Sequence, residues 1–596
     1  MEKRWRWLPT DTELVRTIVR QTGVSPVIAQ LLAIRRIQQP ESIRAFLEPK
    51  LTDLRDPDLL PGLAEAADRL FAAVQNNRRI VIYGDYDADG MTATSILVSC
   101  LKTLNADVTY YVPNRLEDGY GLSCEAIRTL AKRGREVIVT VDCGICSIAE
   151  AELCLELNLE LIITDHHQME SQLPRAAAIV HPALPGGGYP FAGLCGAGVA
   201  LKLAWGLCQR ASGGASRVLP PLREYLLDAL SYAAIGTVAD MVPLIDENRA
   251  LVRHGLQTLQ NRPSIGLLKL MDITNLLKKS SLSSEDIAFT LAPRLNAAGR
   301  LGQAQLAVEL LTTQDSSRAE ALANYLQKLN ADRETLERSM VLAANKQIKE
   351  QFDADSDPAF VLAAPQWHPG VIGVVAGRLA DKFHRPVIVI ALDAMGQKPG
   401  TGSARSPHYI NLHAALNACR DHLVTCGGHA AAAGLRIEEH NLPAFRAAFC
   451  EFVATQTKDC DVVPEIAIDA QVLFGALDVD TVTKIDQLAP FGSGNPRPIL
   501  AATGVQMAEP AKTMGGGDRH FAGRFKQNGS TIRGVAFGQA DWVEQLNNLD
   551  GPIDIAFRPV INEFNGFRRV EIHVVDWRQS DVADCATASA AGRVLI

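Results

Sequence analysis

The chain has 596 residues, 47% of them hydrophobic and 21% charged, with a net charge of −8. One hydrophobic core rarely organises so many residues, so we expect several domains. No apolar run reaches the roughly 18 residues of a membrane span and no secretion signal is evident, so we expect a soluble, cytoplasmic protein without a membrane partner. The acidic balance argues against non-specific coating of nucleic acid, but it permits a nuclease that confines its basic residues to a channel.

Cysteine usage points to the same kind of compartment. Twelve cysteines are spread through the chain, several inside apolar stretches, which is typical of small core residues in a reducing environment. Cys143 and Cys146 form a single C-x-x-C pair. Because a structural zinc needs two more spaced ligands, this pair alone does not favour a zinc site.

The first half of the chain changes pattern twice. Residues 1–74 hold Leu-rich segments separated by Pro and Asp, which predict a helical N-terminal segment. Residues 75–249 alternate short apolar runs with helical periods, which predicts a parallel α/β sheet. Residues 250–355 are helical, and a stretch without Pro or Gly at 316–351 predicts one long connecting helix. The expected strands of the sheet are residues 80–83, 108–112, 137–141 and 159–164.

The second half predicts another α/β unit and a β-rich domain. Residues 356–455 contain apolar runs at 360–364 and 387–391 with helical periods between and after them. Residues 463–578 are rich in Gly and Pro turns and alternating segments, which predicts a small barrel or sandwich. Residues 579–596 carry little patterning and are expected to be a disordered tail.

Carboxylates gather where the first predicted strand ends. In VIYGDYDADGMTAT an apolar run leads directly into Asp85, Asp87 and Asp89 and then into a helix. Ligands of parallel α/β sheets bind beyond the carboxyl ends of the strands. Three neighbouring carboxylates repel one another, and a divalent cation relieves that repulsion. A turn followed by a helix cap is the alternative interpretation of this segment alone.

The same layout recurs at two further strand ends. EVIVTVDCGI ends on Asp142, and LELIITDHHQ ends on Asp165, His166 and His167. Carboxylates together with imidazoles suit Mn²⁺, Zn²⁺ or iron. A fourth piece, AAIGTVADMVPL, places Asp240 in an apolar segment, where a helix cap is the alternative. Together these residues predict two hard cations about 4 Å apart, an arrangement suited to phosphodiester hydrolysis.

Ordered motifs connect these residues to a family. DYDADG, VDCGI, DHH and GTVADMVPL, in this order, resemble the DHH phosphoesterase superfamily. GSARS at 402–406 and GGHAAAAG at 427–434 resemble its second domain, DHHA1. Three further segments resemble the RecJ branch, the single-strand-specific 5′-to-3′ DNA exonucleases; they are LAPRLNAAGRL at 291–301, WHPGVIG at 367–373 and LAPFGSGNPRP at 488–498. The resemblance implies two α/β domains, a parallel-sheet DHH domain and a DHHA1-like domain, joined by a long helix and followed by a C-terminal β-barrel of the OB-fold type.

The resemblance also implies a role for each matching residue. It implies Mn²⁺ or Mg²⁺, as two ions, single-stranded DNA as substrate, and a single-strand-binding protein and a helicase as further partners. The implied metal ligands are Asp87, Asp89, Asp142, His166 and Asp240, supported by Asp85 and Asp165, with His167 at the scissile phosphate. The implied substrate contacts are Arg115, Arg294, Arg300, Ser403, Arg405, Gly427, Gly428 and His429.

Several alternatives remain open from the residues themselves. For each arginine the alternative is an interdomain salt bridge. Tyr83 and Tyr120 are either base-stacking residues or core or turn aromatics. Basic and aromatic residues alternate at 519–526 and 564–569, which suits a single strand or an ordinary barrel strand. For the whole chain, the alternatives are a DHH hydrolase of short oligoribonucleotides, cyclic dinucleotides or pyrophosphate, and a scaffold that has lost its metals.

Overall fold

The structure is a computed structural model that describes residues 3–114, 121–214, 218–354, 356–407, 409–458, 463–564 and 566–580. The described residues form two compact units. The larger comprises residues 55–242 and 254–462 and contains both α/β sheets. The smaller combines the residues up to 54, residues 243–253 and the part of the chain from 463 onward.

The first sheet is parallel throughout, as its apolar runs predict. Its strand order is β3-β2-β4-β5-β6, and every neighbouring pair is parallel. Strands β2 and β4 are buried along their whole length, which is typical of a parallel sheet covered on both faces. The strands are β2 (Ile80–Tyr83), β3 (Val108–Tyr111), β4 (Val137–Val141), β5 (Glu160–Thr164) and β6 (Ala178–Val180).

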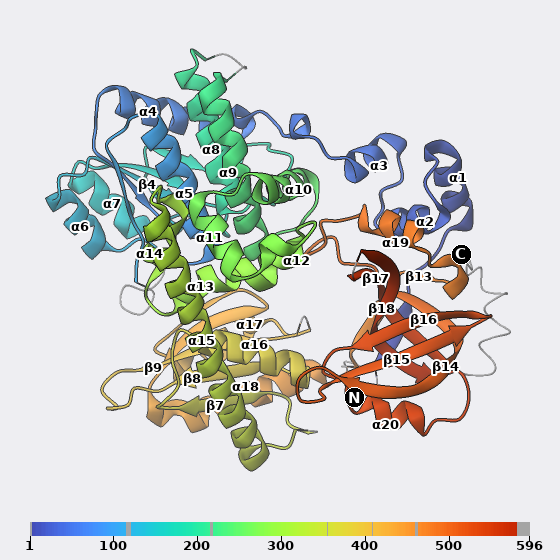
Figure 1. Ribbon diagram of the computed structural model, residues 1–596. Coiled ribbons are helices and arrows are strands. Elements are labelled where there is room, and N and C mark those ends of the chain that lie inside the picture. The colour runs from blue at the N-terminus through green and yellow to red at the C-terminus, as the bar shows by residue number, and fades with distance from the viewer. Residues whose placement is uncertain are drawn as a thin grey trace. The chain divides into compact units, whose positions relative to one another are not determined.

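Helices cover both faces of this sheet. Alternate residues of its strands, such as Val81 and Ile138, pack with Ile127 and Leu153 of α6 and α7 in one core. Figure 1 shows α6 and α7 on one side of β4, with α5, α8 and α9 on the other. These helices are α4 (Leu63–Gln75), α5 (Ala88–Thr103), α6 (Cys124–Lys132), α7 (Ile148–Glu156), α8 (Gly196–Ala211) and α9 (Pro220–Ala239).

A helical connector leads to the second sheet. The predicted long helix is confirmed as α15 (Ser316–Gln351), and it runs down into the second α/β unit (Figure 1). Before it, a π-helical turn at Ile287–Leu291 continues directly into α13 (Ala292–Arg300). The other connector helices are α10 (Asp246–Asn261), α11 (Ile265–Ile273), α12 (Ser284–Asp286) and α14 (Ala304–Thr312).

The second sheet is mixed. Its order is β10-β11-β9-β8-β7, and only β7 and β8 run parallel. Met340 and Ala344 of α15 pack with α16 on one face, whereas Phe445 of α18 packs with α17 on the other. The elements are β7 (Phe360–Ala364), α16 (Ile372–Phe383), β8 (Val387–Ala391), β9 (Gly400–Arg405), α17 (Leu412–Ala418), β10 (Thr425–Gly428), β11 (Ala432–Ile437) and α18 (Leu442–Thr457).

The smaller unit contains a closed β-barrel. Its strand order is β13-β14-β15-β16-β18-β17, and pairing of β14 with β17 closes it. The strands are β13 (Ala470–Gln471), β14 (Leu500–Met514), β15 (His520–Gln527), β16 (Ser530–Ala536), β17 (Ile553–Phe564) and β18 (Phe567–Gln579), with helices α19 (Val479–Asp486) and α20 (Trp542–Asn547). The fold class predicted from the sequence is therefore confirmed. Residues 581–596 of the predicted tail lie outside the described residues.

The N-terminal helices share the core of this barrel. Ile18 and Leu31 pack in one cluster with Phe521 and Phe557. Strand β1 (Arg4–Trp7) pairs in parallel with β12 (Glu465–Ile468), and the helices are α1 (Thr12–Thr22), α2 (Pro26–Ile34) and α3 (Pro40–Leu47). No single helix among the described residues is long and apolar enough to cross a membrane. Helices α1 and α2 reach that length and apolar character only when taken together, and they are bent by 117° relative to each other.

Arg249 explains why a short piece of α10 belongs to the smaller unit. Its buried guanidinium donates hydrogen bonds to the carbonyl oxygens of Phe46, Leu488 and Ala489. It also lies 3.7 Å from the ring centroid of Phe46. Burial lowers the pKa of Arg249 to about 9. One side chain thus joins three segments that are far apart in the sequence.

Candidate active site

The acidic residues meet at the carboxyl edge of the first sheet. Strands β2, β4 and β5 are neighbours, and Asp85, Asp142 and Asp165 follow their last residues by one or two positions. Parallel strands end at the same edge, so the residues that follow them are brought together. Asp142 has φ 63°, a left-handed conformation that Asp tolerates better than most residues. This turn directs its carboxyl group into the site.

Asp89 is held by the beginning of another helix. Its two carboxylate oxygens accept hydrogen bonds from the N–H groups of Gly196 at 2.6 Å and Ala197 at 2.9 Å, in the first turn of α8. Such N–H groups have no partner within their own helix and favour negative charge. Burial and the charge of Asp87 nevertheless raise the pKa of Asp89 to about 6. Two helix starts, of α5 and α8, therefore meet at one carboxylate.

His166 faces the carboxylates without forming a hydrogen bond. Its Nε2 lies 3.0 Å from Asp142 Oδ1, 3.6 Å from Asp240 Oδ2 and 3.8 Å from Asp89 Oδ2. These distances are short enough for ion pairs, but burial lowers the pKa of His166 to about 3, so the imidazole is neutral at pH 7. Nε2 is buried and has no hydrogen-bond partner among the described residues. A cation shared by these atoms accounts for the arrangement.

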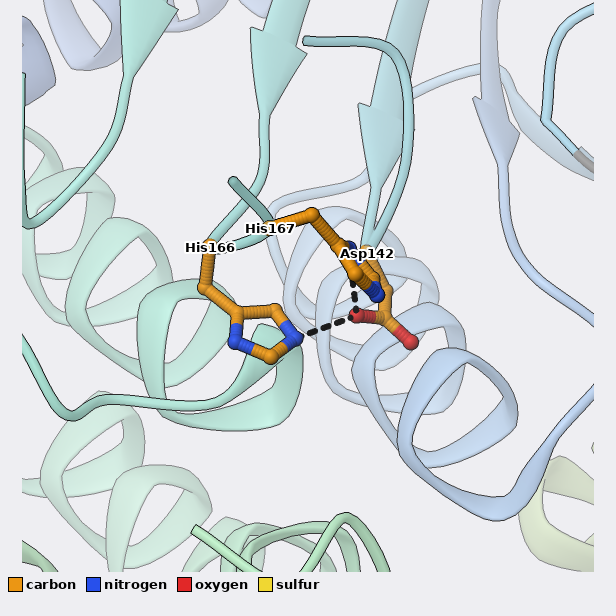
Figure 2. A group of neighbouring side chains, drawn as sticks. All are labelled: Asp142, His166 and His167. Carbon is orange, nitrogen blue, oxygen red and sulfur yellow. Dashed lines mark ion pairs between the residues drawn. The ribbon is translucent and has the colours of Figure 1, made fainter. Parts of the chain in front are cut away.

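Asp165 orients the turn that carries both histidines. Its carboxylate accepts hydrogen bonds from the backbone N–H groups of Ile145, His166 and His167, and Oδ1 lies 2.8 Å from His167 Nδ1. Burial alone would raise the pKa of Asp165, but these bonds lower it to about 2. Burial likewise opposes the charged form of His167, yet Asp165 raises the pKa of His167 to about 9. Figure 2 shows both imidazoles turned toward the carboxyl group of Asp142.

The remaining carboxylates destabilise one another at neutral pH. Burial and the charges of Asp89 and Asp87 raise the pKa of Asp142 well above its ordinary value. The same causes raise the pKa of Asp240 to about 8. Like charges in a dry site disfavour ionisation unless a cation compensates them. Three groups place their donor atoms within 4.8 Å: Asp142, His166 and His167; Asp89, His166 and Asp240; Asp85, Asp87 and Asp142. Oxygen donors with imidazole fit hard or borderline divalent cations.

Two glycines make room for this cluster, and the sequence analysis missed their role. A Cβ on Gly196 would lie 2.6 Å from Asp142 Oδ1, and one on Gly236 would lie 2.4 Å from Asp89 Oδ1. His181 was also missed: its Nε2 lies 2.8 Å from the His167 carbonyl oxygen. The sequence GLCGAG at 193–198 could have indicated the role of Gly196, because two glycines begin an apolar helix there without an obvious turn.

The second α/β unit brings Ser403 and Arg405 together at the start of α16. Arg405 Nη1 donates to Ser403 Oγ at 3.0 Å, and both side chains are partly exposed. A Cβ on Gly373, in the first turn of α16, would lie 3.1 Å from both side chains. A guanidinium, a hydroxyl and a helix N-terminus are together suited to bind a phosphate. Gly373 belongs to WHPGVIG, to which the sequence analysis assigned no site residue.

The other predicted substrate residues have different surroundings. Gly428 has φ 134°, and a Cβ there would lie 2.5 Å from the Cα of Ala433, so the β10–β11 hairpin requires glycine. Gly427 and His429 are exposed beside it. Arg294 is used within the protein, because its Nε donates to Gln327 and its Nη1 to the Thr290 carbonyl. Their roles stay predictions.

Arg300 and two aromatic positions complete the comparison. Arg300 Nη1 donates to the Gly370 carbonyl at 3.4 Å. Arg115 and Tyr120 lie outside the described residues. Tyr83 is fully buried and donates its hydroxyl to the Gly121 carbonyl, so it is a core residue and is inaccessible to a stacking base.

The barrel exposes part of the predicted basic and aromatic set. Phe521 and Phe525 are fully buried in its core. On the opposite side of the same strand Arg524 and Lys526 are exposed. His520 forms an edge contact with exposed Phe537, whose ring in turn contacts His573; the centroid distances are 5.4 and 5.3 Å. The alternation of core aromatics and solvated charges was the alternative interpretation, and it holds for these phenylalanines.

The fold and the donor set define a phosphoesterase of the DHH class. Family models match in the expected order: the DHH family N-terminal domain at 79–235, the DHHA1 domain at 356–455 and the RecJ OB domain at 468–576. The single-stranded-DNA-specific exonuclease RecJ of Bacillus subtilis (strain 168) is 37% identical over 576 residues, covering 96% of this chain and 70% of the relative.

Solved structures agree with this assignment. Crystal structures of RecJ from Thermus thermophilus match with a TM-score of 0.81 for the Mn²⁺ complex and 0.75 for the Mg²⁺ complex. The Mn²⁺ complex is 34% identical, and the match covers 97% of this chain and 80% of that one. The chain belongs to the RecJ family of single-stranded-DNA-specific exonucleases.

Proposed function

We propose that this protein hydrolyses the phosphodiester bonds of single-stranded DNA from the 5′ end, with two Mn²⁺ or Mg²⁺ ions as cofactors. The observation that carries the proposal is His166 Nε2, buried without a hydrogen bond and aimed at oxygens of Asp142, Asp240 and Asp89. The proposed metal ligands are these four residues and Asp87. Bound there, two divalent ions lower the pKa of water and stabilise the leaving oxygen.

The residues around the ligands have distinct tasks. Asp165 holds the turn of the two histidines by four contacts, so that both rings keep one orientation. Its hydrogen bond with Asp165 favours the protonated form of His167, which can donate to a phosphate oxygen. Asp85 supports the ligand group that it forms with Asp87 and Asp142. Asp85 and Asp165 are buried, so their contacts are shielded from water and strengthened.

The second α/β unit supplies a place for a neighbouring phosphate. Ser403 and Arg405 lie side by side at the start of α16, and His429 is exposed in the β10–β11 hairpin. The hydrogen bond from Arg405 to Ser403 fixes the guanidinium before the substrate arrives. Together with Arg115, Arg294 and Arg300 these residues are the proposed contacts to the DNA backbone and its 5′ end.

The barrel supports a polymeric substrate. A small-substrate hydrolase of the DHH type needs only the two α/β units, whereas this chain carries a RecJ OB domain at 468–576. Exposed basic residues and a partly exposed aromatic cluster suit a single strand, since every base offers a face for stacking. Because single strands arise when duplexes are opened, we propose a helicase and a single-strand-binding protein as working partners. A cytoplasmic location also remains a proposal, consistent with the free thiols of the described cysteines.

End-labelled oligonucleotides test the proposal. With Mn²⁺, a 5′-labelled single strand should release labelled mono- or short oligonucleotides from the first turnovers, while a 3′-labelled strand shortens gradually. A chelator should stop both reactions, and a blunt duplex should resist. Early loss of the 3′ label would refute the polarity. Hydrolysis of short oligoribonucleotides or cyclic dinucleotides with no action on long strands would favour the small-substrate alternative.

A further inference from the structure

The loop that carries three of the acids is held from outside by α13. The N–H of Ala88 donates to Oδ1 of Asn296 at 2.8 Å. Ala88 lies between Asp87 and Asp89 and is the first residue of α5, where a backbone N–H has no partner within the helix. Asp87 Oδ1 accepts a hydrogen bond from the N–H of Gly90, a different amide of the same helix. Asn296 therefore accepts the hydrogen bond of the Ala88 N–H, between the proposed metal ligands Asp87 and Asp89.

The backbone of α13 also rests directly on this loop. A Cβ on Gly299 would lie 1.9 Å from the carbonyl oxygen of Tyr86, the residue before Asp87. Only glycine permits this approach. Gly299 is the next-to-last residue of α13 and is buried. Its close contact with Tyr86 gives a packing reason for glycine at this position.

The same turn contacts two further segments. A Cβ on Gly370 would lie 2.1 Å from the carbonyl oxygen of Arg300. Gly370 precedes α16, whose first turn adjoins Ser403 and Arg405. Gly302 has φ 72°, and a Cβ there would lie 2.9 Å from Asn114 Oδ1. Three segments thus meet at the end of α13 and the two residues after it. They are residues 85–89, here called the metal loop, the segment after β3 that contains Asn114, and the approach to α16.

We propose that the segment from Asn296 to Gly302 positions residues of the active site. This segment comprises the last five residues of α13 and the two residues after it. Asn296 fixes the amide between two metal ligands, and close backbone contacts at Gly299 and Gly370 set the spacing between the metal loop and the phosphate-binding residues. The proposal rests on the proposed function, which supplies the metals and the DNA. Residues 295–302 (LNAAGRLG) then have a role in the site that burial and helix propensity alone do not explain.

Metal binding without DNA separates positioning from plain packing. A packing residue stabilises the larger unit whether or not metal is present, whereas a positioning residue changes affinity for the metal. We would measure Mn²⁺ alone by electron paramagnetic resonance of the free ion, and thermal unfolding in chelator, on the full chain. The variants are Asn296→Ala and Asn296→Asp, with Asn324→Ala as control. Asn324 donates to the Glu320 carbonyl on the exposed side of α15, so it loses a comparable bond elsewhere.

The expected outcomes differ for each variant. Asn296→Ala should raise the Kd for Mn²⁺ about 10-fold or more, the usual consequence of removing a residue that orients metal ligands. Asn296→Asp keeps an acceptor at the same place and should bind Mn²⁺ more tightly than Asn296→Ala. Asn324→Ala should bind like the unchanged protein. Unaltered Mn²⁺ affinity in Asn296→Ala would overturn the proposal, as would an equal loss of thermal stability with and without Mn²⁺.

Gly370→Ala tests the second half of the proposal. Its added methyl group meets the Arg300 carbonyl, so the approach to α16 must shift while the metal loop keeps Asn296. We expect unchanged Mn²⁺ affinity and a rise of about 10-fold in KM for single-stranded DNA. Unchanged KM, or a loss of Mn²⁺ affinity, would refute the spacing role. If the unchanged protein degraded no DNA, the proposed function would fail, whereas the Mn²⁺ result for Asn296 would still stand or fall independently.

Discussion

The two α/β units hold their functional side chains in different ways. In the first, Asp85, Asp142 and Asp165 follow the strands and are buried. The side chains of Asp89 and Asp142 are only 1% and 2% exposed. In the second, Ser403 and Arg405 alternate with buried Gly402 and Ala404 along β9 and remain partly exposed. The first site is electrostatically incomplete without cations. The second is already satisfied by hydrogen bonds and needs only to receive an anion.

Removing one charge from the first site should have the largest effect. Asp142→Asn keeps the shape but takes away an oxygen donor shared by two of the ligand groups. We expect hydrolysis of single-stranded DNA to fall by about 10³-fold or more. The same change relieves repulsion, so the metal-free protein should melt at a higher temperature. Nuclease assays and unfolding in chelator measure the two effects, and intact hydrolysis would contradict the metal site.

The pH dependence of stability should reveal the repulsion among the carboxylates of the first site. In the metal-free protein the pKa of Asp89 is raised to about 6 and that of Asp240 to about 8. A raised folded-state pKa stabilises the fold below the unfolded pKa near 4, and this contribution is lost as the pH rises. His166 acts in the opposite direction below pH 6.5, because its folded-state pKa of about 3 lies below its ordinary value of 6.5 and stability therefore rises up to that pH. The free energy of unfolding should then fall between about pH 6.5 and pH 8, by about 2 kcal/mol from Asp240.

Saturating Mn²⁺ is the control for this titration. Bound cations keep the carboxylates charged in the folded state, so the decline in stability toward pH 8 should disappear. Denaturant unfolding at a series of pH values, with chelator and with Mn²⁺, measures it. A metal-free protein whose stability increases from pH 6.5 to pH 8 would show that the carboxylates do not repel as described.

A pair of glycine substitutions tests whether only the first site depends on close packing around its ligands. Gly236→Ala places a methyl group against Asp89, so the Kd for Mn²⁺ should rise by about 10- to 100-fold. Gly434→Ala in the second sheet is the matched control, because its Cβ would meet only the Gly402 carbonyl oxygen, at 3.9 Å. Calorimetric titration with Mn²⁺ distinguishes them. Equal affinities would mean that the first site tolerates displacement of its ligands.

The smallest effect is expected in the second site. Arg405→Lys preserves the charge but loses the planar fork that matches a phosphate. KM for single-stranded DNA should rise about 10-fold, with Mn²⁺ affinity unchanged, because Arg405 belongs to none of the ligand groups. Steady-state kinetics on a long single strand measure it. A change in Mn²⁺ affinity without a change in KM would show that the two sites are not separate.

Strand ends were predictable because their physical signal is local. Apolar runs of four or five residues end directly before Asp85, Asp142 and Asp165 or one residue earlier, and adjacency of parallel strands does the rest. The long helix α15 was predictable for a similar reason, since it lacks Pro and Gly over many turns. The role of Asp165 was less accessible. Its charge suggests a ligand, but its hydrogen bonds to Ile145, His166 and His167 are visible only in three dimensions.

Contacts between distant segments could not be predicted. Gly196 and Gly236 adjoin Asp142 and Asp89 although they lie far along the chain, and Asn296 reaches Ala88 across more than 200 residues. The first strand, β1, gave no clear signal because its partner is β12, near the other end of the chain. Such pairings depend on the complete fold. They leave no period or spacing in either segment alone.

Residue types and motifs alone specify the chemistry of this protein, because oxygen and imidazole donors follow the strand ends and the ordered motifs are those of the DHH class. How those donors are held depends on the tertiary structure. It placed the start of α8 against Asp89, Asn296 against the metal loop, and apolar side chains of the N-terminal helices in one cluster with those of the barrel. Residue types specify which atoms can bind a cation, whereas close backbone approach and burial arise only when segments remote in sequence pack together.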